Sequence, residues 1–455
     1  MKNNLKYLMF LGIFLLMCLC PLVGMAIAGS SEAAANEILA APPALQNADG
    51  SCNAEFLNDT SDYFADHFAY RQELITVNAK LEAALFGESA SEDVILGKDG
   101  WLFYHSTLDD YHGQNLLSDR EIWSAAHCLA LMQEYAQAQN ASFLFTVVPN
   151  KNSLYPECMP DRYIRSDTPG NAERLTEALQ QNGVCTVNLE AAFRNEGCVL
   201  YQKLDSHWSN LGAALAHDTI IDTLGKNAEH FYLPEQYSAV QDHTADLYQM
   251  LYPSDVQKDI QLYPAWDWCF TYDRPIRTAE DQMIHTSCAG QSGTLLMFRD
   301  SFGNTLHPFM AESYEHACFS RAMPYDLSLI DSEGADTLII EIVERNIDWL
   351  SQRAPIFPAP VREIAVPAKS ADAMQITYSF AQVNNGMICC SGSIGCCLDT
   401  DSPIYLVCDG TVYEASPSGN GDNPFTAYLP YQPNEFQLIT IQDGIPVISQ
   451  VFACD

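Results

Sequence analysis

The stretch "GTLLMFRDSFGN" (Gly293–Asn304) decides the fold of this chain. Its first half is a continuous apolar run, which is typical of a parallel strand buried on both faces. Its second half turns small and polar, and a helix is predicted from about Phe302. A buried strand followed at once by a helix is the repeating unit of an α/β protein. Ser301 then lies at the carboxyl end of the strand, which is the edge where open α/β sheets bind their ligands.

The same alternation continues on both sides of this stretch. Apolar runs at Ser142–Asn150 and Asp336–Val343 predict two more buried strands, and Val184–Val187 predicts a shorter one. "VILGKDGWLFY" (Val94–Tyr104) predicts a hairpin around its Lys-Asp-Gly turn. Helices are predicted at about 62–86, from the capping box of Ser118 and Glu121, at 172–181 and just after His207. Together they predict a doubly wound parallel sheet.

The alternation stops near Ile356, where a proline-rich segment begins. Beyond it the chain consists of short β-type runs separated by turn residues, which predicts a small β-sandwich. We therefore predict five segments: a signal peptide or membrane anchor (1–28), a linker (29–59), an α/β domain (60–355), a Pro-rich linker (356–370) and a β-sandwich domain (371–455).

The N-terminus indicates export. Lys2 and Lys6 precede the apolar run Tyr7–Ala28, and Ala26-Ile27-Ala28 is typical of a signal peptidase site. The run is also long enough to span a bilayer if it is retained. Cleavage and anchoring stay open, but with either outcome the body is expected outside the cytoplasm, extracellular or in the cell envelope.

The charge balance excludes some partners. The chain carries 58 acidic and 22 basic residues, a formal net charge of −36. A protein this acidic repels nucleic acid and anionic membrane surfaces, so we expect no nucleic-acid partner.

The cysteines could form disulfides or bind metal. Of 16 cysteines, all but Cys18 and Cys20 lie beyond the N-terminal apolar run, which leaves 14. In an oxidising compartment many of these are expected to form disulfides. The dense patch "CCSGSIGCC" (Cys389–Cys397) lacks the spaced Cys-x-x-Cys pairs of a zinc site, so disulfides are favoured there too.

Ser301 is the candidate nucleophile. At the start of a helix, backbone N–H groups and the helix dipole favour a developing oxyanion. Gly303 would let a substrate approach the backbone, and Asn304 adds an amide donor. The alternative is that Ser301 only caps the helix, because serine is a favoured N-cap residue.

A second stretch, "LYQKLDSHWSNLGAA" (Leu200–Ala214), supplies the other groups of a serine triad. Asp205 could hold one imidazole nitrogen of His207 while the other nitrogen faces Ser301. The alternative is a surface Asp-x-His pair with Trp208 filling the core.

Several stretches, in a fixed order, resemble the SGNH-hydrolase-like group that includes the alginate O-acetyltransferases AlgX and AlgJ, and especially the bacterial family named after its Asp-His-His-Trp motif. They are "YFADHFAYRQELI" (63–75), "VILGKDGWLFY" (94–104), "VVPNKNSLYPE" (147–157), "KLDSHWSNLGA" (203–213), "RDSFGN" (299–304) and "EIVERN" (341–346). The resemblance implies an SGNH-hydrolase-like α/β domain with a triad of Ser301, His207 and Asp205. It also implies O-acetylation of a cell-envelope or extracellular polysaccharide, with an acetyl donor and a membrane-bound acyl-transfer partner.

Three positions depart from the family pattern. Ser206 replaces the first histidine of the motif, Arg299 replaces a glycine, and Asn188 stands where some relatives have aspartate. Arg321 and Tyr325, which follow the serine helix, are further candidates for substrate binding.

The chemistry of a serine triad needs no metal, nucleotide or other cofactor. Acyl transfer to a sugar and hydrolysis to acetate both stay open, as does a catalytically inactive glycan-binding or assembly protein. Aromatic residues could stack on sugars or fill the core, and the core is favoured; they are Trp101, Tyr104, Tyr111 and Trp123.

Overall fold

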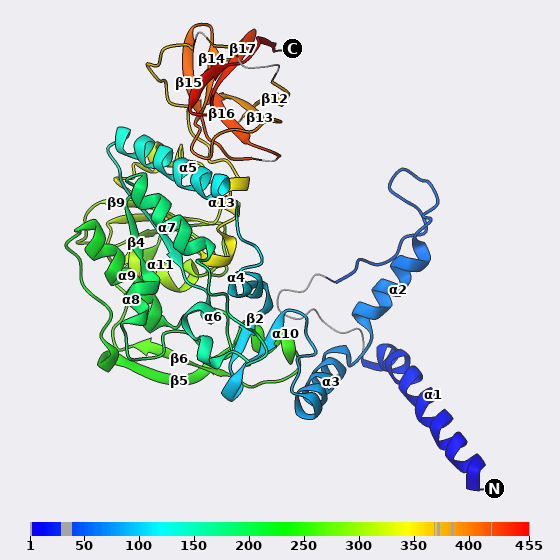
Figure 1. The fold of residues 1–455 in the computed structure, drawn as a ribbon. Helices are drawn as coiled ribbons and strands as arrows, with labels where there is room; N and C mark the ends of the chain where they lie inside the picture. The colour runs from blue at the N-terminus through cyan, green and yellow to red at the C-terminus, as the bar shows by residue number, and fades with distance from the viewer. Residues whose placement is uncertain are drawn as a thin grey trace.

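A seven-stranded sheet forms the centre of the α/β part of the computed structural model, which describes residues 2–28, 39–367, 369–370, 374–383, 386–419 and 421–454. Its strand order is β4-β3-β11-β9-β10-β8-β7 (Figure 1). The strands are β3 (Ser142–Val148), β4 (Thr186–Asn188), β7 (Thr271–Tyr272), β8 (Met283–Ser287), β9 (Thr294–Phe298), β10 (His316–Ser320) and β11 (Thr337–Val343). The α/β class is confirmed.

The sheet is mixed and not wholly parallel, which corrects the sequence prediction. Strands β4, β3, β11, β9 and β10 are parallel, but β8 pairs antiparallel with β10, and β7 antiparallel with β8. The connection from β8 to β9, residues 288–293, is short. A parallel crossover needs a dozen residues or more, so this connection fits only opposite strand directions.

Helices cover both faces of the sheet. The side chains of β9 alternate, with Leu295 and Met297 in one core and Leu296 and Phe298 in the other. The first core includes α8 (Leu189–Arg194), α9 (Asn210–Leu224) and α11 (Gly303–Ala311). The second includes α5 (Asp119–Ala138), α7 (Asn171–Gln181), α12 (Leu329–Glu333) and α13 (Trp349–Gln352). The doubly wound arrangement is therefore confirmed.

The long helix predicted at 62–86 is wrong. The structure has α2 (Phe56–His67) and α3 (Arg71–Phe86), and α2 begins inside the predicted linker 29–59. The break lies at Phe68, which is extended, and at Tyr70, whose φ of 63° is left-handed. Bulky residues rarely adopt that conformation, so no local pattern indicates the break. The hairpin of β1 (Val94–Leu96) and β2 (Leu102–Tyr104) is confirmed.

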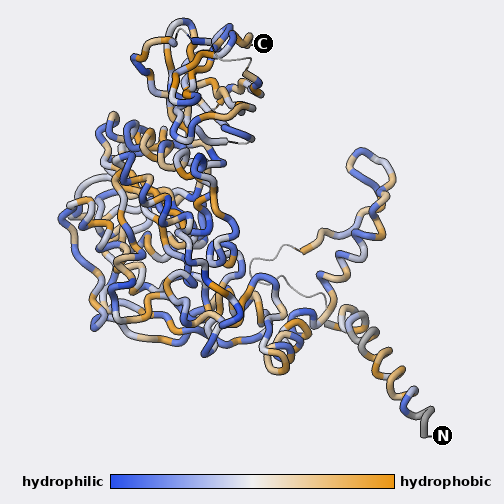
Figure 2. Tube along the Cα trace, viewed as in Figure 1, coloured by the Kyte–Doolittle hydropathy of each residue, from blue (hydrophilic) through white to orange (hydrophobic). Residues whose placement is uncertain are grey.

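The N-terminal helices project from the body of the molecule. Figure 1 shows α1 (Lys2–Ala28) and α2 reaching away from the sheet, and Figure 2 shows that α1 is largely apolar. Within the part of the chain that the structure describes, no helix has both the length and the apolar character to cross a membrane. Gly29, which follows the predicted cleavage site, lies outside the described residues.

One excursion between α9 and β7 carries residues that matter below. It contains the antiparallel hairpin of β5 (Tyr237–His243) and β6 (Asp259–Pro264), with α10 (Asp246–Leu251) between the two strands. Two further short helices, α4 (Leu108–His112) and α6 (Lys151–Leu154), lie beside β2 and after β3. Neither the hairpin nor α10 was predicted, because their runs are short and mix polar with apolar residues.

The C-terminal part consists of two antiparallel sheets around one apolar core. One sheet contains β12 (Ile376–Gln382), β13 (Ile388–Ile394) and β16 (Pro424–Leu429). The other contains β14 (Ile404–Cys408), β15 (Thr411–Ala415), β17 (Glu435–Gln442), β18 (Ile445–Ile448) and β19 (Phe452–Ala453). The first residues of the predicted domain, 371–373, lie outside the described residues.

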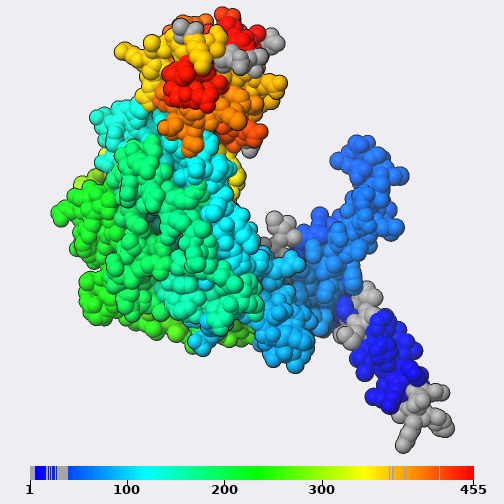
Figure 3. Space-filling view, in the orientation of Figure 1, coloured from blue at the N-terminus to red at the C-terminus, as the bar shows by residue number. Residues whose placement is uncertain are grey.

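This β part rests on one end of the α/β part, over α5 (Figures 1 and 3). Arg362 of the proline-rich segment joins Glu134 of α5 to Glu414 of β15. His127 of α5 also contacts Glu414, at 2.9 Å. Arg120 donates to backbone carbonyls of the loop after β13, including that of Ser402 at 2.6 Å. The two parts are thus fastened by charged contacts.

The predicted disulfides are absent among the described residues. Two cysteines instead pack as small apolar side chains in separate cores, Cys318 in β10 and Cys390 in β13, and Cys128 in α5 is buried against the Ser418 hydroxyl. Burial raises the pKa of the Cys128 and Cys318 thiols to about 12, so both are protonated near neutral pH unless a cation binds them.

Candidate functional site

Asp300, two residues after the end of β9, fixes the turn that carries Ser301. The Asp300 carboxylate accepts hydrogen bonds from the backbone N–H of Phe302 at 2.8 Å and of Val343 at 2.7 Å. The second bond ties the turn after β9 to the end of the neighbouring strand β11. This anchoring leaves Ser301 at the carboxyl edge of the sheet, on the turn that opens α11.

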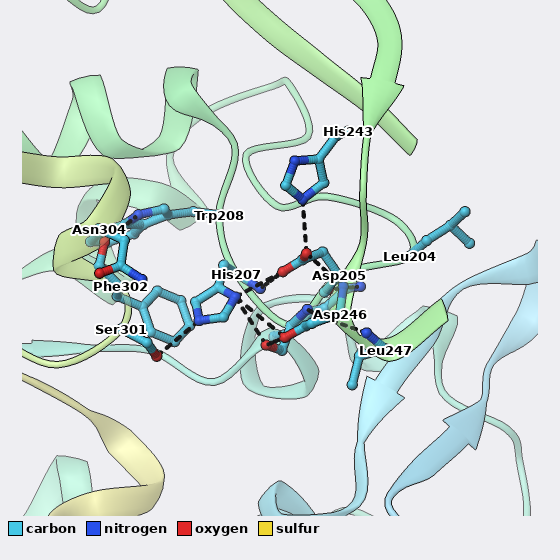
Figure 4. Close-up of polar contacts among 12 residues, drawn as sticks. Leu204, Asp205, His207, Trp208, His243, Asp246, Leu247, Ser301, Phe302 and Asn304 are labelled. Carbon is cyan, nitrogen blue, oxygen red and sulfur yellow. Dashed lines mark hydrogen bonds and ion pairs between the residues drawn. The ribbon is translucent and has the colours of Figure 1, made fainter. Parts of the chain in front are cut away.

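Ser301, His207 and Asp205 form one hydrogen-bonded line (Figure 4). His207 Nε2 lies 2.9 Å from Ser301 Oγ, and His207 Nδ1 lies 2.8 Å from Asp205 Oδ1. The structure thus brings together all three residues that were expected to form a triad. In such an arrangement the imidazole can take a proton from the hydroxyl, and the carboxylate holds the imidazole in the required tautomer.

The side chain of Ser301 does not cap the helix. The N-cap position of α11 is Phe302, and no side chain caps it. Among the described residues, the backbone N–H groups of Ser301 and Gly303 have no protein acceptor. Two free donors at a helix start are suited to a negatively charged oxygen.

The Asp205 carboxylate accepts four hydrogen bonds. Two come from His207, through its ring Nδ1 and its backbone N–H. The other oxygen, Oδ2, is 2.8 Å from His243 Nε2 and 3.0 Å from the backbone nitrogen of Asp246. Asp205 is only 4% exposed, so it is a buried carboxylate whose lone pairs are well occupied.

Asp246 is a second carboxylate close to His207. Its Oδ2 lies 3.5 Å from His207 Nδ1 and accepts a hydrogen bond from the Ser206 hydroxyl. Ser206 also donates its backbone N–H to Asp246, at 2.8 Å. The serine that replaces the first histidine of the family motif thus binds α10 to the loop that carries Asp205.

Lys151 is buried under the loop that carries Asp205 and donates hydrogen bonds to its backbone. Its Nζ lies 2.8 Å from the backbone oxygen of Asp205, and also contacts the oxygens of Leu102 and Lys203 at 2.7 and 2.9 Å. Burial lowers the pKa of Lys151 to about 7, although the charges of nearby carboxylates oppose this shift. Lys151 Nζ also lies over the ring of Trp101, so this tryptophan packs against the lysine under the loop and does not line the cleft.

Asp205 and His207 each shift the pKa of the other. Burial by itself raises the pKa of Asp205, but the hydrogen bonds from His207 and His243 outweigh it and hold this pKa well below 3.8. Burial by itself lowers the pKa of His207, but the hydrogen bond and charge of Asp205, with the charge of Asp246, raise it above 6.5. The ionised aspartate therefore makes the imidazole a stronger base.

An aromatic pair fixes the histidine from the other side. Trp208 is 1% exposed, and its indole N–H donates to the backbone oxygen of Phe302 at 3.1 Å. The Phe302 ring lies 4.8 Å from the His207 ring and edge-on to Trp208. The tryptophan does fill the core, as the alternative interpretation expected, but it also joins the histidine loop to the serine turn.

A cleft of about 430 Å³ opens above Ser301 and His207. It is lined by Tyr104, Gln202, Met250, Gln261, Glu280, Asn304, Thr305, Arg321 and Arg345, together with the residues around His207. Two of the predicted substrate residues therefore lie in the cleft. Asn304 and Arg321 both contact Glu280, which lies on a loop at the rim.

Two other predicted substrate residues do not line the cleft. Tyr325 is 6% exposed and packs against Phe298 in the core on the α5 face, so it cannot reach a substrate above Ser301. A side chain on Gly303 would collide with Arg299, at about 2.5 Å from its Cδ. Gly303 is thus small to make room for Arg299, and only its N–H is available to a substrate.

The remaining departures from the family pattern have structural roles. Arg299 is buried, and its guanidinium donates to Asn304 Oδ1 at 2.6 Å and to the Ala279 oxygen at 2.7 Å. It therefore orients the asparagine of the cleft. Asn188 caps α8 by accepting from the N–H of Ala191.

His243 and Asp246 were missed by the sequence analysis. Both come from the excursion between α9 and β7, some forty residues after Asp205. No local pattern at either position indicates a site.

Of the four aromatic candidates for sugar stacking, only Tyr104 lines the cleft; Tyr111 is buried and Trp123 stacks on His127.

Comparison with known proteins supports the expected relationship. Residues 94–283 match the family model described as SGNH hydrolase-like domain, acetyltransferase AlgX; the range includes Asp205 and His207 and ends before Ser301. The chain is 26% identical over 192 residues to the probable alginate O-acetylase AlgJ of Pseudomonas syringae pv. tomato. That match covers 41% of this chain and 46% of the relative, so it spans less than half the length of the curated relative.

Similar solved structures include PatB1 of Bacillus cereus, at 17% identity and a TM-score of 0.43, covering 55% of this chain and 95% of that one. A DHHW family protein of Eubacterium siraeum is similar at 18% identity and a TM-score of 0.40, covering 56% of this chain and 91% of that one. The family model and the curated relative confirm the resemblance carried by the sequence motifs: residues 94–283 are similar to the SGNH hydrolase-like domain of AlgX, and part of the chain is similar to AlgJ.

Proposed function

We propose that this protein is an exported serine acyltransferase that O-acetylates a cell-envelope or extracellular polysaccharide through an acetyl-Ser301 intermediate. The observation that carries the proposal is the hydrogen-bonded line from Ser301 Oγ through His207 to Asp205, at the mouth of a cleft. The match of residues 94–283 to the model of an acetyltransferase family supports it.

In the first half-reaction, Ser301 Oγ attacks the carbonyl carbon of the acetyl donor while His207 Nε2 takes the hydroxyl proton. The carbonyl oxygen becomes an oxyanion, which the N–H groups of Ser301 and Gly303 stabilise. Collapse of this intermediate breaks the bond to the leaving group, and His207 returns the proton to that group. The product is an acetyl ester on Ser301.

In the second half-reaction, a hydroxyl of the acceptor loses its proton to His207 and attacks the acetyl carbon. Ser301 leaves and recovers its proton from His207, which restores the enzyme. If water takes the place of the acceptor, the product is acetate and the protein acts as an esterase. The polar groups of the cleft, with Tyr104 at its rim, are suited to a sugar.

The relative of Pseudomonas syringae carries the name alginate O-acetylase, and we extend to this chain the acceptor class, a polysaccharide. A membrane-bound partner would deliver the acetyl group, because the donor pool of the cell lies in the cytoplasm. Export follows from the signal-like N-terminal run.

The experiment compares wild type with Ser301→Ala on an activated acetyl ester, with and without oligosaccharide acceptors, and follows acetate and acetylated sugar separately. A matched control exists in the chain. Ser313 Oγ lies 2.7 Å from His217 Nε2, and His217 Nδ1 lies 2.8 Å from Asp218, but this second Ser-His-Asp line is buried away from the cleft.

We expect Ser301→Ala to lose turnover and Ser313→Ala to keep it. Acetylated oligosaccharide formed only with Ser301 establishes the transferase. Acetate release that no acceptor changes would establish an esterase. Equal rates for wild type and Ser301→Ala would reject catalysis and leave a glycan-binding or assembly protein.

A further inference from the structure

Three potential metal ligands meet on the face of the sheet that packs against α12. His285 is on β8, Cys318 is on β10 and Glu333 is the last residue of α12. His285 and Cys318 are direct partners in the antiparallel register of β8 and β10. Their ligand atoms and a carboxylate oxygen of Glu333 all lie within 4.8 Å of one another.

The donor set has a chemical preference. One imidazole nitrogen, one thiol sulfur and one carboxylate oxygen are the ligand types that zinc takes, at bond lengths of about 2.0–2.3 Å. In a tetrahedral site these bonds put neighbouring ligand atoms about 3.3–3.8 Å apart. His285 Nε2 and Glu333 Oε2 are already 3.3 Å apart, and the Cys318 sulfur lies within 4.8 Å of both ligand groups, so closing the site needs the sulfur to approach by at most about 1.5 Å.

We propose that His285, Cys318 and Glu333 bind a zinc ion. The side chains of His285 and Glu333 are 26% and 25% exposed, which gives the ion a path from solvent and leaves a fourth position for water. Cys318 is 1% exposed and anchors the site in the core of the sheet. Three protein ligands on three separate elements make the ion a clamp between β8, β10 and α12.

The clamp would act close to the candidate active site without taking part in its chemistry. Gln282 lies three residues before His285, and Arg321 lies three residues after Cys318. Each pair is therefore about 10 Å apart along its strand. There the N–H of Arg321 donates to the Gln282 oxygen at 2.9 Å, and Arg321 lines the cleft. An ion would therefore hold the end of β10 that presents Arg321.

Two alternatives to this zinc site predict different behaviour. His285 and Glu333 could form a simple ion pair, with Cys318 as a core residue that binds nothing. A metal could also prefer the cluster of Asp205, His207 and Asp246, although hydrogen bonds already occupy those groups. Only the proposed site requires a thiolate ligand.

The experiment uses the reduced, chelator-treated full chain. Zn²⁺ binding is measured by titration calorimetry, and Co²⁺ is added as a spectroscopic substitute whose thiolate charge-transfer band reports a sulfur ligand. Cys318→Ser, His285→Gln and Glu333→Gln are compared with two controls, Cys288→Ser and His207→Gln. Cys288 is a buried cysteine that directly follows β8, so it matches Cys318 in burial, but it lies in the core on the other face of the sheet, away from the proposed site.

We expect one tight Zn²⁺ equivalent and a thiolate–Co²⁺ band in wild type and in both controls. Cys318→Ser should lose the band, and each of the three ligand variants should weaken Zn²⁺ binding at least tenfold. Zn²⁺ should also raise the thermal midpoint of wild type but not of Cys318→Ser, because a ligand of the native state stabilises it. Circular dichroism checks that each variant is folded, and His285→Gln, which is partly exposed, keeps the test valid if Cys318→Ser fails to fold.

The proposal is overturned if wild type gives no thiolate–Co²⁺ band, or if binding survives in Cys318→Ser and disappears in His207→Gln. The latter result would put the metal at the candidate active site. Neither outcome depends on acyl transfer, so the proposed function stands or falls separately.

Discussion

His243 Nε2 lies 2.8 Å from Asp205 Oδ2, the carboxylate oxygen that the ring of His207 does not use. Asp205 is therefore held between two histidines, one facing Ser301 and one on the β5 side (Figure 4). A carboxylate that is buried and accepts several donors cannot rotate freely. Its orientation of His207 then depends on residues outside the predicted triad.

We predict that His243→Ala lowers kcat about tenfold, equivalent to about 1.4 kcal/mol, roughly one hydrogen bond to a charged group. KM for a small acetyl ester should stay unchanged. With one donor lost, the charge of Asp205 acts more strongly on His207, so the acid limb of the pH–rate profile should move to higher pH. His243→Gln, which restores an N–H donor, should reverse both effects. A fall in kcat with an unshifted limb would mean that His243 acts only on the fold.

The pH dependence of the reaction follows from the raised pKa of His207. Catalysis needs the neutral imidazole, so the rate should be full above this pKa and fall as the pH drops through it. We predict a midpoint above 6.5 in the kcat/KM profile for a neutral acetyl ester.

Asp205→Asn should move that midpoint to lower pH, because it removes the charge that stabilises the imidazolium. It should also reduce kcat by up to about 10⁴-fold, since the amide favours the wrong tautomer. A wild-type midpoint well below 6.5, or a midpoint that Asp205→Asn leaves in place, contradicts the assigned roles.

Lys151→Met is predicted to weaken both the fold and the site. The change removes a donor from three carbonyls, among them that of Asp205, although the Lys203 carbonyl keeps the N–H of Leu102 as a donor. The cost should be at least about 2 kcal/mol, because each buried acceptor left unpaired costs about 1–3 kcal/mol. Urea unfolding measures the free energy, and kcat measured well below the unfolding transition shows the effect on the site.

Lys226→Met serves as the control for this change. Lys226 Nζ is bonded to one carbonyl, that of Ser292, in a more exposed setting. Its loss should cost less than about 1 kcal/mol and leave kcat unaltered. Equal costs for the two variants would show that the carbonyl cluster under Asp205 contributes nothing special.

The sequence predicted those parts of the fold that have strong local patterns. The apolar runs of β3, β9 and β11 and the capping box of Ser118 and Glu121 all appear in the structure. The strands β8 and β10 were missed, because "MIHTS" and "HACFS" are short and mix polar with apolar residues. Their place is decided by pairing with β9 and not by their own composition.

The site divides in the same way. Ser301 and His207 each lie within three residues of a regular element, so their positions could be inferred from the sequence. His243 and Asp246 reach Asp205 only because a hairpin and a short helix fold back over the loop, which no local pattern predicts. Tyr325 follows β10 as Arg321 does, but it turns into the core below the sheet.

The last prediction concerns the coupling of Ser301 and His207. Their side chains are joined by one 2.9 Å hydrogen bond, and the hydroxyl is a weak nucleophile without the base. Ser301→Ala and His207→Ala should each lower kcat by at least about 10³-fold, and the double variant should be no worse than either single one. All three should stay folded, which thermal unfolding checks. A fluorophosphonate probe should label wild type and the buried-serine control Ser313→Ala, but neither Ser301→Ala nor His207→Ala. If the two losses multiply in the double variant, the residues act independently and the proposed proton transfer between them is wrong.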